Sequence, residues 1–284
     1  MEAFASDGTL SLPKESAAGA ARLHFRRWRP AGEAKAAVLL SHGYAEHVGR
    51  YEHVAAALNR AGYDVFAVDH WGHGRSDGVP GFAPAFSVYL DGMDALLAEA
   101  RGAASGKKFF LIGHSMGGLV AANYLIVRQD AFAGAVLSGP SLKAVDEPPA
   151  AVMMIGRLLS KLAPKAGLIS LDANLVSRDP AVVAAYVGDP LVYRGKISAR
   201  LGAVMVDAMR DALEGAAAIN LPLLILHGGE DGLTSPDGSR EFAARVSSGD
   251  KTLKIYDGFY HEIFNDPGKE GVIADVIAWL DARV

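Results

Sequence analysis

The 284-residue chain contains no cysteine, which excludes disulfides, a thiolate nucleophile and metal sites built on thiolates. Charge is modest, with 28 Lys and Arg against 32 Asp and Glu, and the basic residues form no cluster. This balance argues against nucleic acid as a partner. No uninterrupted apolar stretch approaches the length that spans a bilayer. Residues 1–8 lack the basic start and apolar core of a secretory signal, so we expect a soluble, cytoplasmic protein.

A recognisable metal pattern is also missing. His42, His47 and His53 lie close in sequence, as do His70 and His73. None of them has the HExxH spacing on a helix, and no carboxylate triad accompanies them. We therefore expect no catalytic metal and no cofactor.

What the chain does have is a core-forming pattern, since half of its residues are hydrophobic. Short apolar runs alternate with helical patterns, which predicts an α/β fold with a mostly parallel central sheet flanked by helices. Because the runs are continuous and apolar, we expect strands that are covered on both faces. The runs are Ala36–Leu40, Asp64–Val68, Phe109–Ile112, Gly134–Ser138, Leu223–Leu226 and Thr252–Tyr256.

The two ends of the chain carry weaker patterns. Residues 10–29 predict an antiparallel hairpin at the edge of the sheet, with Leu23, Phe25 and Trp28 as its buried side chains. The last helix is expected at Gly271–Arg283.

The alternation stops between Pro140 and Asn220, where no clear strand pattern occurs and helical patterns take over. We predict a helical cap inserted over the mouth of the sheet. The expected cap helices are 150–163, Pro180–Tyr186 and Ile197–Glu214. The predicted organisation is a first core part at 1–139, a cap or lid at 140–219, and a second core part at 220–284.

The predicted helix at 150–163 allows two interpretations of equal weight. Its first turns are apolar all round, which fits either packing against the sheet or transient contact with a membrane or lipid aggregate. The second interpretation would make the protein peripheral to a membrane. Four apolar residues share one face of this helix and three polar ones lie opposite: Val152, Ile155, Leu159 and Leu162 against Arg157, Ser160 and Lys161.

The segment Gly113-His114-Ser115-Met116-Gly117 lies between an apolar run and a helical pattern. This is the G-x-S-x-G nucleophile elbow in its expected strand–turn–helix context. The turn is so tight that side chains at Gly113 and Gly117 would clash, which explains the two glycines. An ordinary glycine-rich loop would not explain a bare hydroxyl between them. We predict Ser115 as a catalytic nucleophile.

A serine hydroxyl needs a base, usually a histidine that a carboxylate orients. In an open α/β sheet these partners lie beyond the carboxyl ends of later strands. Asp231 follows the fifth apolar run and His261 the sixth, in the chain order that this fold uses. Glu230 is the competing candidate for the orienting acid. The alternative interpretation of Asp231 is an ordinary turn aspartate. Asp237 is assigned to the N-cap of the next helix.

The same chemistry needs two donors for an oxyanion. One is the backbone N–H of Met116, which follows the nucleophile at a helix start. The second should come from the loop after an earlier strand, and we assign it to the N–H of Tyr44 within Ser41–His47.

With these residues placed, the chain resembles the α/β-hydrolase superfamily, and within it the monoacylglycerol lipase/lysophospholipase family with its bacterial members. The resemblance covers about residues 22–283 and rests on several segments in order. They are His42–Tyr51, Asp69–Ser76, Gly113–Gly118, Ser177–Pro180 with Tyr186 and Asp189–Leu191, and Lys251–Tyr256 with Tyr260–Glu262.

The resemblance implies a carboxylic-ester hydrolase that acts on monoacylglycerols or similar single-chain lipid esters, with an apolar acyl tunnel under the cap. By position, Glu46, Arg50 and Tyr186 match the family's head-group residues. Glu46 and Arg50 also have the i,i+4 spacing of a simple salt bridge, and both interpretations are held equally. Tyr44 is larger than its counterpart in many members, so its ring is expected to narrow the acyl or alcohol side.

Two kinds of alternative remain open. Within enzymes, a short-chain carboxylesterase, lysophospholipase or thioesterase would use the same fold and triad. A non-catalytic ligand-binding homologue is a rival of another class. Such homologues usually lose a triad member, whereas all three candidates are present here.

Overall fold

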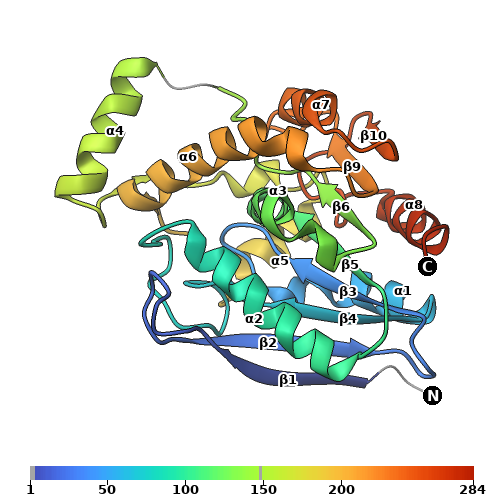
Figure 1. Cartoon of the computed structure of the whole chain (residues 1–284). Helices are drawn as coiled ribbons and strands as arrows, with labels where there is room; N and C mark the ends of the chain where they lie inside the picture. The colour runs from blue at the N-terminus through green and yellow to red at the C-terminus, as the bar shows by residue number, and fades with distance from the viewer. Residues whose placement is uncertain (1–3, 147–148) are drawn as a thin grey trace.

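The computed structural model describes residues 4–146 and 149–284. Its main feature is one eight-stranded sheet in the order β1-β2-β4-β3-β5-β6-β9-β10 (Figure 1). The six strands from β4 to β10 pair in parallel, while β1 and β2 are antiparallel to their neighbours. The strands are β1 Phe4–Ser11, β2 Arg22–Arg29, β3 Ala36–Ser41, β4 Tyr63–Val68, β5 Phe109–His114, β6 Gly134–Ser138, β9 Leu223–Gly228 and β10 Lys251–Tyr256.

The apolar runs become strands because an interior strand of a parallel sheet is covered on both faces. Every residue of β3, β4, β5, β6 and β9 is buried. The prediction of full coverage is wrong for β10, which has one neighbour and alternates exposed with half-buried residues. Lysines at 251 and 254 suit an exposed edge of this kind.

The edge hairpin is confirmed, with a longer first strand than predicted, since β1 starts at Phe4. Leu23 and Trp28 are buried as expected. The prediction that Phe25 is buried is wrong. Its ring is half-buried and packs over Gly8 of β1, a residue without a side chain.

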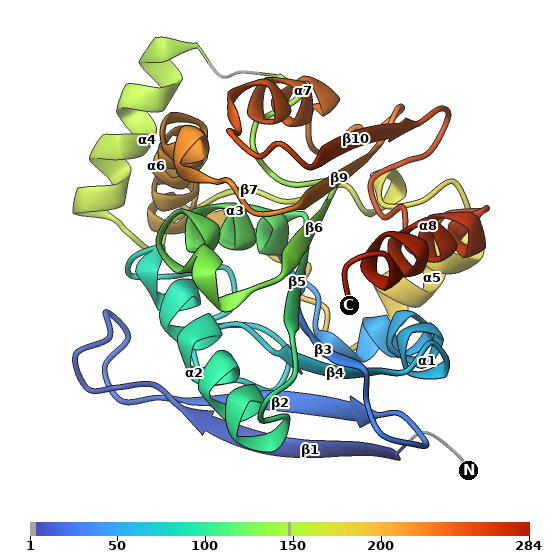
Figure 2. The ribbon, with the colours of Figure 1, turned by 45° about the vertical axis from the view of Figure 1, so that its right-hand side comes forward.

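Helices cover both faces of the sheet (Figures 1 and 2). On one face α1 and α8 pack over a buried cluster, and on the other α2, α3 and α7 do so. The last helix lies two residues earlier than predicted. The bounds are α1 Glu52–Arg60, α2 Ser87–Ala103, α3 Met116–Arg128, α7 Pro236–Arg245 and α8 Lys269–Asp281, with short 3₁₀ turns at Val48–Tyr51, Gln129–Ala131, Ala173–Leu175 and Ala216–Ala218.

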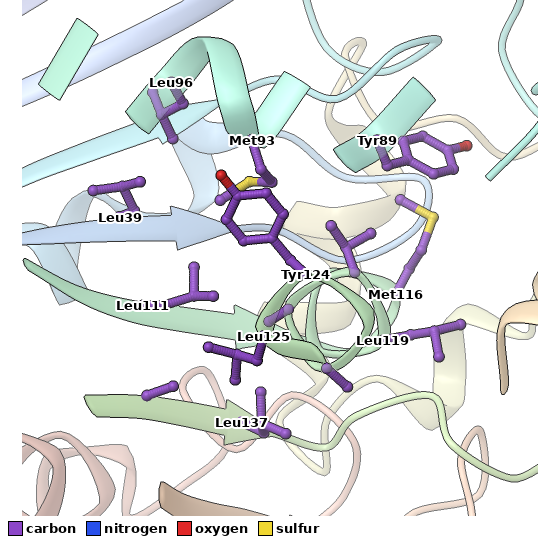
Figure 3. Close-up of a cluster of buried hydrophobic side chains, with 14 of the residues drawn as sticks. Leu39, Tyr89, Met93, Leu96, Leu111, Met116, Leu119, Tyr124, Leu125 and Leu137 are labelled. Carbon is purple, nitrogen blue, oxygen red and sulfur yellow. The ribbon is translucent and has the colours of Figure 1, made fainter. Parts of the chain in front are cut away.

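The larger cluster anchors the start of α3. Figure 3 shows side chains of α3 pointing between α2 and the strands, with Tyr89 of α2 beside Met116. Met116, Leu119 and Tyr124 of α3 are almost fully buried there. The residue that follows Ser115 is therefore fixed by core packing.

The segment between β6 and β9 contains the predicted helices. They are α4 Ala150–Leu162, α5 Pro180–Gly188 and α6 Ala199–Gly215. It also holds two short paired strands that periodicity did not reveal, β7 Gly167–Ile169 and β8 Ile197–Ser198. Strands of two or three residues are too short to show an alternating pattern.

Helix α6 packs on α3 and leads back toward β9, while α4 lies along α6 at the periphery (Figures 1 and 2). Within α4, Ser160 is the residue that is buried, although it belongs to the predicted polar face. The predicted apolar face points largely outward: its exposed members Val152, Ile155 and Leu162 are joined by Met154 and Leu158, all between 54% and 74% exposed. Packing on the core does not account for this surface.

Candidate active site

Ser115 lies on the tight turn between β5 and α3 with a φ of 55°. A Cβ on Gly113 would come within 2.4 Å of the Gly117 carbonyl oxygen, and one on Gly117 within 2.1 Å of the Ser41 oxygen. Both distances are far below normal contact, so only glycine fits on either side of the serine. The clash at Gly117 comes from the end of β3, which the sequence alone does not show.

The structure brings the three predicted triad residues together. The Ser115 hydroxyl donates to His261 Nε2 at 2.8 Å, and His261 Nδ1–H donates to Asp231 Oδ2 at 2.7 Å. All three side chains are buried. The geometry is that of a nucleophile, a base and an orienting acid within hydrogen-bond reach of one another.

Asp231 is held in place by its own loop after β9. Its Oδ1 accepts the backbone N–H groups of Leu233 and Thr234 at 2.8 and 2.9 Å, and its Oδ2 accepts the Thr234 hydroxyl. His227 Nε2 lies 3.1 Å from the same Oδ2. Burial alone would raise the pKa of Asp231, but the His261 charge and these histidine hydrogen bonds hold it far below its ordinary value.

Sequence reasoning missed His227 and Thr234. Both lie within four residues of Asp231, and His227 ends the apolar run of β9 where a buried polar residue stands out. The competing Glu230 forms no hydrogen bond with His261, so Asp231 alone has the position of the orienting acid. The N-cap assignment of Asp237 is wrong: Ser235 caps α7 by accepting the Asp237 N–H, and Pro236 takes the first helical position.

The two histidines nearest the serine titrate in opposite directions. Burial lowers the pKa of His261, but Asp231 more than offsets this and the net pKa is raised. Burial and the neighbouring His261 lower the pKa of His114 to about 3, so His114 stays neutral. Their rings lie 5.0 Å apart. Only His261 is suited to take a proton near neutral pH.

The amides predicted as oxyanion donors lie at the ends of β3 and β5. Met116 opens α3, whose first N–H groups have no partner within the helix. In the loop after β3, the Gly43 N–H donates to Glu46 Oε1 at 2.6 Å, whereas no hydrogen bond of the Tyr44 N–H is found within the described residues. Tyr44 N–H therefore remains available.

The Tyr44 ring turns into the protein. It lies edge-on to His73 and to Tyr193, with centroid separations of 5.6 and 6.4 Å. The ring is buried and its hydroxyl finds no partner within the described chain. Contact with Tyr193 places it against the segment between β6 and β9.

Glu46 and Arg50 form the i,i+4 salt bridge that their spacing allows, at 2.8 Å. Arg50 also donates both guanidinium ends to Glu262, a residue that sequence reasoning missed although it adjoins His261. Tyr186 lies under this guanidinium at 4.7 Å from the ring centroid. The Tyr186 side chain is 5% exposed, and its hydroxyl forms no hydrogen bond within the described residues.

Residues 4–146 and 149–284 hold no group of three or more His, Asp or Glu side chains arranged to bind a metal ion. None of the helices in these ranges combines the length and apolar composition of a membrane span.

The chain is similar to known proteins over most of its length. The family model described as serine aminopeptidase, S33 matches residues 32–268. A monoacylglycerol lipase of Mycolicibacterium smegmatis is 39% identical over 92% of this chain and 94% of its own length. The crystal structure of a Paleococcus ferrophilus monoacylglycerol lipase superposes with a TM-score of 0.82 at 33% identity over the full length of both chains. A soluble variant of the Saccharomyces cerevisiae monoglyceride lipase, solved with a substrate analogue, also gives 0.82, at 26% identity over 93% and 92% of the two chains.

Proposed function

Because the chain belongs to the monoacylglycerol lipase family of α/β-hydrolases, we propose that it hydrolyses monoacylglycerols to fatty acid and glycerol. Its match to the family model of S33 serine hydrolases is consistent with this proposal. The observation that carries the proposal is the chain of hydrogen bonds from Ser115 through His261 to Asp231. Such a chain activates a serine toward an ester carbonyl without a metal.

In the first half of the reaction, His261 Nε2 takes the proton as Ser115 Oγ attacks the ester carbonyl. Asp231 keeps His261 in the tautomer that leaves Nε2 free and stabilises the imidazolium. The N–H groups of Tyr44 and Met116 stabilise the oxyanion, and losing one such donor typically costs about 3–4 kcal/mol. His261 then gives its proton to the departing glycerol oxygen.

In the second half, water enters and His261 takes its proton. The hydroxide attacks the acyl-enzyme, the fatty acid leaves, and the proton returns to Ser115. The depressed pKa of Asp231 keeps it ionised throughout, so it orients the base without taking the proton itself.

For substrate binding, we assign the cap to residues 140–219 and the head-group contact to Tyr186. The hydroxyl of Tyr186, which has no hydrogen-bond partner within the described residues, can hydrogen-bond a glycerol hydroxyl. The polar atoms of Glu46 and Arg50 are already engaged with each other and with Glu262, so a head group would have to displace an ion pair.

A finer part of the proposal concerns delivery of the substrate. The outward apolar surface of α4 suits transient contact with a membrane or lipid aggregate, because lone exposed apolar residues are common but a continuous helical stripe is not. Ile169 of β7, in the segment that follows α4, is also apolar and is 64% exposed. Such contact would place the cap where monoacylglycerols are concentrated.

The decisive experiment replaces the nucleophile and varies the ester. Ser115→Ala should fold, lose labelling by a fluorophosphonate probe and lose at least about 10³-fold in kcat on monoacylglycerols. A Ser115→Ala protein with the parent rate would refute the mechanism. Rates on diacylglycerols, lysophospholipids, thioesters and p-nitrophenyl acetate separate the rival hydrolase classes, and an inert, unlabelled parent would indicate a non-catalytic binding protein.

A further inference from the structure

Two buried glutamates and one largely buried arginine join the two loops that carry catalytic groups. Glu46 and Arg50 lie in the segment after β3 that contains Tyr44, and Glu262 directly follows His261. The two glutamates are only 2% and 4% exposed. Charged groups this deeply buried are tolerated only when they are paired.

Arg50 provides the pairing. Its Nη1 donates to Glu46 Oε2 at 2.8 Å and to Glu262 Oε1 at 2.6 Å, while Nη2 donates to Glu262 Oε2 at 2.7 Å. The contact with Glu262 is the two-pronged geometry in which a planar guanidinium is strongest and most directional. Asn265, three residues after Glu262, also donates to Glu262 Oε2 at 2.9 Å and helps to fix that carboxylate.

The second carboxylate oxygen of Glu46 contacts the backbone of the loop Ser41–His47. We call this loop the oxyanion loop, because it carries the Tyr44 N–H. Its Oε1 accepts the Gly43 N–H and the Tyr51 hydroxyl, both at 2.6 Å. The loop needs this support, because Ala45 has a φ of 69°, in a region that side-chain-bearing residues rarely adopt. The Gly43 N–H is committed to Glu46, whereas the next amide, that of Tyr44, forms no hydrogen bond within the described residues.

We propose that the Glu46–Arg50–Glu262 ion-pair network positions the oxyanion loop against the loop of the catalytic histidine. The proposal rests on the proposed function, because it assigns these residues a role in the same reaction. All three are positioning residues, since their polar atoms contact one another and the loop backbone. The network fixes the position of the loop that carries the Tyr44 N–H relative to the loop that carries His261.

The network also acts on the base through its charge, since it holds two carboxylates for one guanidinium. The charged or titratable groups around His261 are Asp231 from the loop after β9, His114 from β5, Glu46 and Arg50 from the segment after β3, and Glu262 on its own loop. Burial lowers the pKa of His261, and Asp231 raises it. The two glutamates, Glu262 and Glu46, raise this pKa further. Removing the Glu262 charge therefore lowers this pKa.

The test uses Glu46→Gln and Glu262→Gln with two esters, a monoacylglycerol and p-nitrophenyl butyrate, which has no glycerol. We expect kcat to fall about tenfold to a hundredfold, by the same factor on both esters, with KM nearly unchanged. The acidic limb of kcat against pH should move to lower pH in Glu262→Gln. Glu33→Gln removes an exposed carboxylate paired with Lys107 and should leave rates at the parent level.

Three outcomes overturn the proposal. One is a higher KM on the monoacylglycerol alone, which would make the glutamates head-group ligands. Another is unchanged kcat in both variants, and the third is an unmoved acidic limb in Glu262→Gln. If Glu46→Gln does not fold, Glu262→Gln alone decides, with fluorophosphonate labelling to count competent sites. A parent protein inactive on both esters would instead overturn the proposed function itself.

Discussion

At the residue scale, burial and a carboxylate partner together decide which histidine can act as a base. His42, His70, His73 and His114 are fully enclosed and their pKa values are lowered, chiefly by burial. His261 is equally enclosed, yet its pKa is raised because a carboxylate accepts its Nδ1–H. Among these five histidines, His261 is the one whose pKa is raised, as a base that works near neutral pH requires.

The raised pKa of His261 has a kinetic consequence. The reaction needs the neutral imidazole, so kcat/KM should rise with pH through the pKa of His261 in the free enzyme, at a midpoint above 6.5. Asp231→Asn should lower kcat about 10⁴-fold and move this midpoint to lower pH. Both are measured with p-nitrophenyl butyrate between pH 5 and 9. A parent midpoint below 6.5 would contradict the prediction.

The triad positions could be predicted from sequence because each is tied to the end of a strand in a known order. The residues that hold the triad could not. Thr234 reaches Asp231 through a turn whose shape no periodicity encodes. Glutamate is usually exposed, so the sequence gives no sign that Glu262 is buried. Its burial depends on Arg50, 212 positions earlier, which pairs with it.

At the element scale, hydrophobic periodicity predicted which residues share one face of a helix or strand. It did not predict whether that face points to the core or to the surface. The strand runs were found within one or two residues, since a short continuous apolar run between turn residues is typical of a buried strand. For α4, the shared face of Val152, Ile155 and Leu162 was found, but it faces outward. A hydrophobic stripe is the same in sequence whether a core or a lipid surface covers it.

The outward stripe of α4 leads to a binding prediction. Met154→Glu combined with Leu158→Glu should abolish flotation with phosphatidylcholine vesicles that contain monoolein, because two charges would have to enter the interface. Hydrolysis of the soluble ester p-nitrophenyl butyrate should be unchanged. Val127→Glu, at an equally exposed apolar residue of α3, is the matched control and should float like the parent. Parent-like flotation of the double variant would argue against membrane contact.

At the scale of the whole molecule, the buried neutral histidines make stability depend on pH. Their folded pKa values lie below the unfolded value of about 6.5, so the unfolded chain takes up protons first as the pH falls. The pKa of His73 is lowered to about 4, mainly by burial, so its contribution is complete above pH 6.5 and is lost toward pH 4. Asp69, with a pKa lowered to about 2, adds a loss below pH 4, and His261 acts in the opposite sense.

Urea unfolding at pH 7 and pH 5 should show this dependence. We expect proton uptake by His73 in the unfolded chain to lower the free energy of unfolding by about 2 kcal/mol between the two pH values. His73→Phe should reduce the total loss by about that amount, whatever its effect at pH 7. Equal pH dependence in the variant and the parent would show that His73 takes up its proton in the folded state.

The position of the insertion has an evolutionary consequence. It leaves β6 and returns to β9, which pair directly in the sheet, and α6 alone has the place of an ordinary crossover helix on α3. The peripheral helix α4 can therefore be lengthened, shortened or replaced without changing the strand order of the sheet. Ser141 and Val176 are different, because they hydrogen-bond to Ser115 and to Glu262 beside His261. A new acyl preference could be acquired by recombination in the segment of α4, with the hydrolytic apparatus inherited unchanged.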